Sequence, residues 1–113
     1  MKISKENAQA LWRERYGYVY YVFDFNGNLM CYDGYGDSNC YRTIWGKEIF
    51  CGWNIHHILP KSKGGTANKN NLACTNMITN IKAADKITYW IDNRKYQVQK
   101  NSNGYEIITL KKL

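Results

Sequence analysis

The stretch from residue 53 to residue 86 constrains this chain more than any other part of its sequence. It reads WNIHHILPKSKGGTANKNNLACTNMITNIKAADK and contains both histidines, the only proline and a Gly-Gly pair. An adjacent His-His pair ends a run that is typical of a β-strand, a polar loop follows, and the last part has helical character. The remaining segments are expected to be organised around this stretch.

Proline and glycine delimit the first elements of the stretch. Residues 53–59 predict a strand, and Pro60 would stop it because proline cannot donate to a β-ladder. Residues 61–70 are polar and predict a loop with the Gly-Gly pair at its tip. Residues 72–74 then predict a short returning strand.

A helix is expected to complete the stretch, over residues 77–86. Thr75 or Asn76 can act as its N-cap, because both side chains can accept a hydrogen bond from a backbone N–H in the first turn. Three apolar residues of this helix are expected to share one face: Met77, Ile81 and Ala84.

The segments before this stretch predict a helix and a β-hairpin. Ser4 is a suitable N-cap for a helix that runs to Tyr16 and ends at Gly17. Two runs rich in β-branched and aromatic residues then flank an Asn-Gly pair, which is the strongest two-residue hairpin signal; they are residues 18–24 and 29–32. Residues 33–52 are interrupted by glycines and predict irregular structure with a short strand at residues 48–51.

The end of the chain predicts a small sheet. Three strand-like segments alternate with turn residues, at residues 87–91, 96–100 and 105–110. With 113 residues, the chain is long enough for one modest core, and we expect a single α+β domain over residues 1–113. Its expected parts are an N-terminal helix and hairpin (1–52), the central stretch (53–86) and a C-terminal antiparallel β extension (87–113).

The positive charge is confined to the second part of the chain. The formal net charge is +7; residues 1–52 carry six basic and six acidic residues, whereas residues 53–113 carry ten and three. Such asymmetry indicates a polyanionic partner, against the plainer interpretation of a lysine-rich solvated surface.

The sequence favours a cytoplasmic protein with no membrane partner. The first ten residues lack the apolar core and cleavage site of a secretory signal, and the longest apolar run, residues 18–23, is too short to span a bilayer. The four cysteines show no CxxC pairing, so free buried thiols are expected rather than a zinc site. They are Cys31, Cys40, Cys51 and Cys74.

The two adjacent histidines are expected to do different work. Neighbouring side chains on a strand point to opposite faces, so one histidine can bind a metal while the other transfers a proton. Hydrolysis of a phosphodiester at neutral pH needs an activated water and neutralisation of charge in the transition state. A histidine and a divalent cation would supply these two requirements.

The motif around these histidines resembles the HNH family of endonucleases, whose shared unit is the ββα-metal finger. The matching residues, in order, are Trp53, His56-His57-Ile58, Pro60, Gly64-Gly65, Asn71-Leu72 and Asn80. The resemblance implies a metal-dependent endonuclease that hydrolyses DNA, preferably double-stranded DNA. In such an enzyme, a water activated by a histidine attacks a metal-bound phosphate.

The same resemblance implies a role for each polar residue of the motif. His57 would be the general base, and Asn71 would brace the loop so that His57 is held in position. His56 and Asn80 would be the protein ligands of one divalent metal ion. Because an imidazole replaces the more common aspartate at position 56, the ion is left open among Mg²⁺, Mn²⁺, Ni²⁺ and Zn²⁺.

Basic residues around the motif are expected to contact DNA phosphates. They are Lys61, Lys63, Lys69, Lys82 and Lys86, with Arg94, Lys95 and Lys100 farther along the chain. Two alternatives stay open. The first is that the chain is a catalytically degenerate nucleic-acid-binding module. The second is that it is a nuclease toxin domain with an inhibitor or immunity partner.

Overall fold

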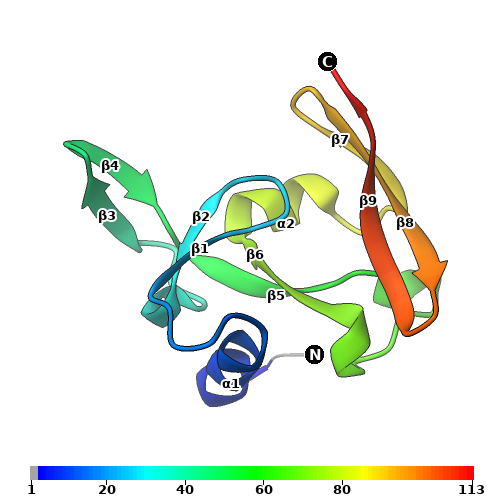
Figure 1. Cartoon of the computed structure of the whole chain (residues 1–113), viewed down its shortest axis with the longest axis horizontal. Helices are drawn as coiled ribbons and strands as arrows, with labels where there is room; N and C mark the ends of the chain where they lie inside the picture. Colours follow the sequence, from blue (N-terminus) through cyan, green and yellow to red (C-terminus); the bar gives the residue numbers. More distant parts are fainter. Residues whose placement is uncertain (1–2) are drawn as a thin grey trace. The chain divides into compact units, whose positions relative to one another are not determined.

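Residues 3–113, as described by a computed structural model, form an α+β fold with two α-helices and several small antiparallel sheets. Figure 1 labels these elements along the chain. The chain divides into two units: unit 1 comprises Met1–Ile55 with Cys74–Ile78, and unit 2 comprises His56–Ala73 with Thr79–Leu113. In the described part of the chain, no helix combines the length and the apolar character that crossing a membrane would require.

Unit 1 begins with helix α1, Lys5–Tyr16, whose two ends lie where the sequence predicts them. The Ser4 side chain accepts a hydrogen bond from the backbone N–H of Asn7, and Gly17 ends the helix with a φ of 76°. Trp12 is fully buried, and its ring centroid lies 4.9 Å from that of Trp53. The helix is therefore fixed to the unit 1 core by aromatic packing.

The predicted hairpin is confirmed as strands β1, Tyr21–Phe23, and β2, Leu29–Cys31. Asp24, which is buried, organises the turn between them: its Oδ1 accepts hydrogen bonds from the backbone N–H groups of Asn26 and Asn28, both at 2.9 Å. Its other carboxylate oxygen accepts from the backbone N–H of Asn76 at 2.9 Å. Asp24 thus links the hairpin to a residue fifty-two positions later in the chain.

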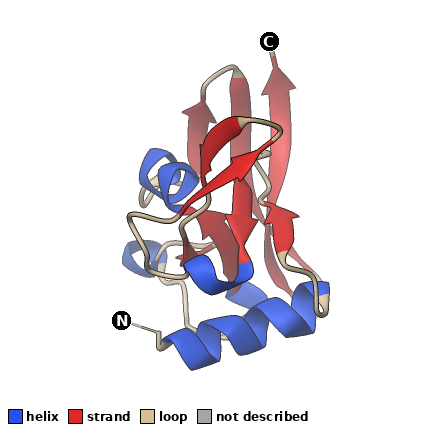
Figure 2. Cartoon of the chain, turned by 90° about the vertical axis from the view of Figure 1, so that its left-hand side faces the viewer, coloured by secondary structure: helices blue, strands red, loops and turns tan. Residues whose placement is uncertain are grey.

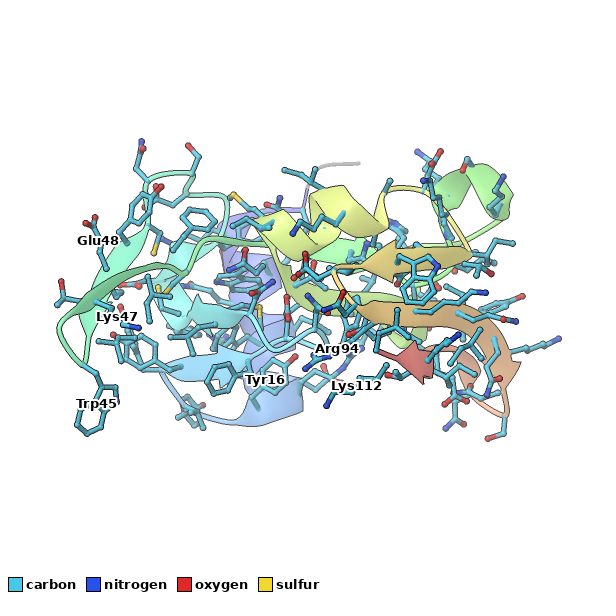
Figure 3. The ribbon with its side chains drawn as sticks, turned by 90° about the horizontal axis from the view of Figure 1, so that it is seen from above. Tyr16, Trp45, Lys47, Glu48, Arg94 and Lys112 are labelled. Carbon is cyan, nitrogen blue, oxygen red and sulfur yellow. The ribbon has the colours of Figure 1, made fainter. Side chains whose placement is uncertain are left out.

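Residues 33–52 contain a second hairpin: its second strand corresponds to the short strand predicted at residues 48–51, whereas its first strand lies where irregular structure was predicted. Strands β3, Tyr41–Ile44, and β4, Lys47–Phe50, pair in antiparallel register around a two-residue turn. Trp45 and Gly46 form that turn with φ angles of 52° and 76°. Figure 3 shows Trp45 at the tip of this hairpin. The prediction missed it because glycine, asparagine or aspartate normally marks such a turn at both positions.

Three cysteines gather in the core of unit 1. Cys31, Cys40 and Cys51 form one buried cluster, in which the Sγ atoms of Cys31 and Cys40 lie 3.1 Å apart. All four cysteines are buried and free, as the sequence predicts. Gly34 completes the cluster, because a Cβ there would lie within 2.9 Å of both the Cys31 and the Cys40 sulfur atoms.

Unit 2 contains the predicted C-terminal sheet. Strands β7, Thr88–Ile91, β8, Arg94–Asn101, and β9, Gly104–Lys112, form an antiparallel meander in the order β7-β8-β9 (Figure 2). One face of the sheet carries the buried side chains, which are Tyr89, Ile91, Tyr96 and Val98. The strand-like segments and the turn residues between them therefore predicted this sheet correctly.

Between these segments, the chain forms two strands and a helix. Strands β5, Trp53–His57, and β6, Leu72–Asn76, pair in a two-stranded sheet, and helix α2, Met77–Ala83, follows directly. Of the two predicted caps, Asn76 is the one whose side chain accepts from a first-turn N–H, that of Ile78, at 2.9 Å. The strand–loop–strand–helix order matches the prediction.

Helix α2 is shorter than predicted, and its buried face was predicted wrongly. It ends at Ala83 because Ala84 takes a left-handed conformation, with a φ of 52°. Ile81, expected on the apolar face, is 77% exposed, while Thr79 and Ala83 are fully buried. In so short a helix, local packing overrides the apolar spacing.

Candidate functional site

Strand β5 and helix α2 bring His56 and Asn80 together in unit 2. His56 is only 5% exposed, and its Nδ1 lies 2.7 Å from the Oδ1 of Asn80. Because an amide oxygen only accepts, this hydrogen bond places the proton of a neutral His56 on Nδ1. Burial lowers the pKa of His56 below its ordinary 6.5 and outweighs the Asn80 hydrogen bond, which acts in the opposite direction. His56 is therefore neutral at pH 7.

His57, the last residue of β5, has different surroundings. It is half-buried, whereas its neighbour His56 is buried, as expected for adjacent side chains on a strand. Partial burial lowers the pKa of His57 below 6.5, and the positive charge of Lys61 lowers it further. A neutral imidazole at pH 7 can accept a proton from an approaching molecule.

Asn71 ties together the loop that follows His57. Its Oδ1 accepts from the backbone N–H of Leu59 at 2.8 Å, and its Nδ2 donates to the carbonyl oxygens of Leu59 and Thr66 at 3.1 and 2.8 Å. Its backbone carbonyl also accepts from the N–H of Ile58 at 2.8 Å. Asn71 thus contacts both residues that follow His57, Leu59 through its buried side chain and Ile58 through its backbone carbonyl.

Gly65 allows the loop to approach this asparagine closely. A Cβ at Gly65 would overlap the carbonyl oxygen of Leu59 and lie 2.9 Å from the Nδ2 of Asn71. Gly64, just before it, has a φ of 96°, a conformation that side chains disfavour. Gly64 is thus required by the backbone conformation of the turn, and Gly65 is required by the close packing against Leu59 and Asn71.

The donor atoms of His56 and Asn80 fit a divalent cation that keeps open coordination positions. An imidazole nitrogen and an amide oxygen lie side by side, and both have lone pairs that a cation would share in place of the proton now between them. In residues 3–113, no group of three or more His, Cys, Asp or Glu side chains could hold a metal ion.

The five predicted phosphate-binding lysines are all exposed and belong to unit 2, but their surroundings differ. Lys61 is the one whose charge acts on His57. Lys82 forms an ion pair with Asp92, in which Nζ lies 3.2 Å from Oδ1. Lys63 and Lys69 lie in two short 3-10 turns of the loop, and Lys86 lies between α2 and β7.

Several residues around the site are not identifiable from the sequence. Leu59 and Thr66 act through backbone groups, which any residue type would provide, so no sequence signal marks them. The turn between β8 and β9 lies against the loop, because a Cβ on Gly104 would come within 3.4 Å of the Asn70 Cβ. The two segments are more than thirty residues apart in the sequence, so residue spacing does not indicate that they are in contact.

Comparison of the chain with models of protein families, with curated proteins and with solved structures finds no match.

Proposed function

We propose that this chain is a metal-dependent endonuclease that hydrolyses DNA phosphodiester bonds, with residues 53–86 acting as a ββα-metal finger of the HNH kind. The observation that carries the proposal is the 2.7 Å contact between Nδ1 of His56 on β5 and Oδ1 of Asn80 on α2, beside a half-buried His57. Two potential metal donors and a potential base thus lie in one unit, two of them on β5 and one on α2.

His57 is the proposed general base. Its lowered pKa keeps the ring neutral at pH 7, so that a ring nitrogen can take a proton from the attacking water. The water oxygen would then form a bond to phosphorus while the bond from phosphorus to the leaving oxygen breaks, and the proton would remain on the imidazole until it passes to solvent. Asn71 is the proposed positioning residue, because its hydrogen bonds fix Leu59 and the carbonyl of Asn71 fixes Ile58.

His56 and Asn80 are the proposed holders of one divalent cation. When bound, such a cation neutralises charge on the phosphate and assists departure of the leaving oxygen. The buried environment of His56 supports this assignment, since a neutral imidazole is the form that binds metal.

The charge distribution supports a nucleic-acid substrate. Unit 2 carries ten basic and three acidic residues, while unit 1 carries six of each, so the excess of +7 lies entirely in the unit that holds the histidines. Lysines around a phosphodiesterase site would position the backbone without reading sequence.

The test of the chemistry is a plasmid-cleavage assay with Mg²⁺, Mn²⁺, Ni²⁺ or Zn²⁺ added separately and with EDTA as the blank. Cleavage by the wild type, its loss in His57→Ala and its retention in Asn93→Ala, an exposed turn residue of unit 2, are the expected results. Full activity in His57→Ala would remove the assignment of the base. Salt-sensitive DNA binding without cleavage under any metal would instead make the chain a binding module.

The test of the metal site does not depend on activity. A cation that binds the folded chain alone raises its melting temperature, by an amount that grows with cation concentration. We expect such a rise in the wild type and its loss in both His56→Ala and Asn80→Ala. Equal stabilisation of all three proteins would place the cation elsewhere.

A further inference from the structure

A pocket in unit 2 lies beside the loop that Asn71 braces. It has a volume of about 220 Å³, is open to solvent, and is lined by six of residues 64–71 on one side and by residues 103–105 of the β8–β9 turn on the other. Asn71 itself lines the pocket, and its hydrogen bonds to Leu59 connect this wall to the segment that follows His57. One wall of the pocket is therefore formed by the loop that follows His57.

The lining is polar but carries no formal charge. Apart from glycines, the pocket is lined by threonine, tyrosine and asparagine side chains: Thr66, Asn68, Asn70, Asn71, Asn103 and Tyr105. Phosphate sites require basic side chains or free backbone N–H groups. The fragment that fills this pocket is thus expected to be neutral.

Four backbone N–H groups that border the pocket are already engaged. Those of Gly64 and Gly65 donate to the carbonyl oxygens of Lys61 and Pro60, at 3.1 and 2.9 Å. Those of Asn70 and Asn71 donate to the side chain and the backbone carbonyl of Asn68, at 3.0 and 2.8 Å. These four groups are consequently not available to an anion.

Three side chains of the lining are available to a ligand. The side chains of Asn70, Asn103 and Tyr105 make no hydrogen bond or ion pair with another residue in the described part of the chain. Each asparagine amide offers a donor and an acceptor together, which is the pattern that reads the edge of a nucleobase. A tyrosine ring offers a face on which a base can stack.

We propose that this pocket binds one unpaired nucleobase of the nucleic acid, an inference that rests on the proposed nuclease function. Tyr105 stacks on the base, and Asn70 and Asn103 hydrogen-bond to its edge. Lys63 precedes Gly64 in the loop, and Lys100 pairs with Tyr105 across β8 and β9; both are exposed. These lysines contact the phosphates on either side of the bound nucleotide.

A nucleobase fits better than a neutral sugar, although amides and a tyrosine suit both. The pocket lies in unit 2, which has ten basic and three acidic residues. This positive charge attracts a polyanion but does not attract an uncharged saccharide. The ring that enters the pocket would therefore be carried by a phosphate backbone.

The experiment compares a fluorescent single-stranded oligonucleotide with an abasic oligonucleotide of the same length and charge. Binding is measured by anisotropy with the full-length His57→Ala protein, so that cleavage does not interfere. We expect the base-bearing strand to bind more tightly, and we expect Asn103→Ala combined with Tyr105→Leu to weaken its binding about fivefold to a hundredfold. Binding of the abasic strand should not change.

Two further variants keep the result interpretable. Tyr105→Phe preserves the ring and should retain the preference for the base-bearing strand. Asn93→Ala is the matched control for Asn103→Ala, because Asn93 lies in the other two-residue turn of the sheet, between Ile91 and Arg94. This variant should also retain the preference for the base-bearing strand. Circular dichroism checks that each variant is folded, and a misfolded Tyr105→Leu protein is replaced by Asn70→Ala in the double variant.

The outcomes separate this proposal from the nuclease itself. An unchanged base preference in the double variant overturns the pocket assignment, even if the wild type cleaves DNA. A preference that the double variant loses supports the pocket, even if the wild type cleaves nothing. Equal binding of both strands, or competition by a neutral oligosaccharide, overturns the proposal.

Discussion

Asn71 uses almost all of its side-chain hydrogen-bonding capacity to hold one loop. Replacing it with alanine leaves the N–H of Leu59 and the carbonyls of Leu59 and Thr66 without their partner; Asn71 is buried, Leu59 is half-buried and Thr66 is exposed. Unsatisfied buried groups cost about 1–3 kcal/mol each, partly relieved by water entry. We expect Asn71→Ala to lower the free energy of unfolding by about 2–3 kcal/mol in a urea titration.

Asn70→Ala is the matched control, because Asn70 is the preceding residue, exposed, with no side-chain hydrogen bond to a described residue. Its effect should stay within about 0.5 kcal/mol, as for an ordinary surface substitution. Equal destabilisation by the two variants would mean that the Asn71 hydrogen bonds do not brace the loop.

The two histidines predict a dependence of stability on pH. Burial lowers the pKa of both below 6.5, so between the folded-state pKa and about 6.5 the unfolded chain binds more protons than the folded chain. Stability contributed by the neutral rings should therefore be complete above pH 6.5 and fall as the pH drops through that window. Metal-free protein, unfolded with urea at several pH values, measures this slope.

His56→Asn provides the comparison, since asparagine is polar and does not titrate. The loss of stability on acidification should be smaller in this variant than in the wild type, with the remainder due to His57. An identical slope in both proteins would assign the pH dependence to other groups.

At the scale of elements, the turn of the β3–β4 hairpin holds a residue in an unfavourable conformation. Trp45 has a φ of 52° and is 98% exposed, so its ring gains almost no burial in exchange. A left-handed conformation costs about 1–2 kcal/mol for most residues and much less for asparagine. We expect Trp45→Asn to raise the free energy of unfolding by about 1 kcal/mol, measured by thermal or urea unfolding.

Gly46→Ala tests the same turn in the opposite direction. Gly46 has a φ of 76° and no atom within 4 Å of an added Cβ, so backbone strain alone should destabilise this variant by about 1 kcal/mol. A neutral or destabilising Trp45→Asn would indicate that the indole makes a contact that stabilises the fold.

The elements that the sequence predicted are those with strong local signals. The ends of α1 at Ser4 and Gly17, and the Asn-Gly turn of the first hairpin, depend on residues adjacent in the chain. The β3–β4 hairpin was missed because tryptophan at its turn gives the wrong local signal. The buried face of α2 was wrong because only packing decides whether Thr79 or Ile81 is covered.

The candidate site also has features that the local sequence predicted and features that it could not predict. Strand alternation predicted unlike surroundings for His56 and His57, and the structure has one buried and one half-buried. The backbone partners of Asn71 and the approach of the β8–β9 turn to the loop depend on tertiary contacts. Such contacts have no local signature, so the pocket became visible only in the folded chain.

At the scale of the whole molecule, the uneven charge predicts how DNA binding responds to salt. Removing one lysine that binds a phosphate should make the slope of log affinity against log salt shallower by about 0.9. Lys61→Ala and Lys63→Ala should each produce about that change, whereas Lys82→Ala should produce less because Asp92 already pairs with Lys82 at 3.2 Å. The binding is measured with metal-free His57→Ala protein at several salt concentrations.

Lys47→Ala is the control, because Lys47 is an exposed lysine on β4 in unit 1, whose basic and acidic residues balance at six each. If unit 2 alone binds the polyanion, this substitution leaves the slope unchanged while removing the same charge from the protein. If every lysine contributes through net charge, Lys47→Ala and Lys61→Ala shift the slope alike, and the charge excess would then be a solvated surface with no defined DNA path. Comparing the salt slopes of Lys47→Ala and Lys61→Ala therefore decides whether the net charge of +7 in unit 2 marks a DNA-binding face or only a basic composition.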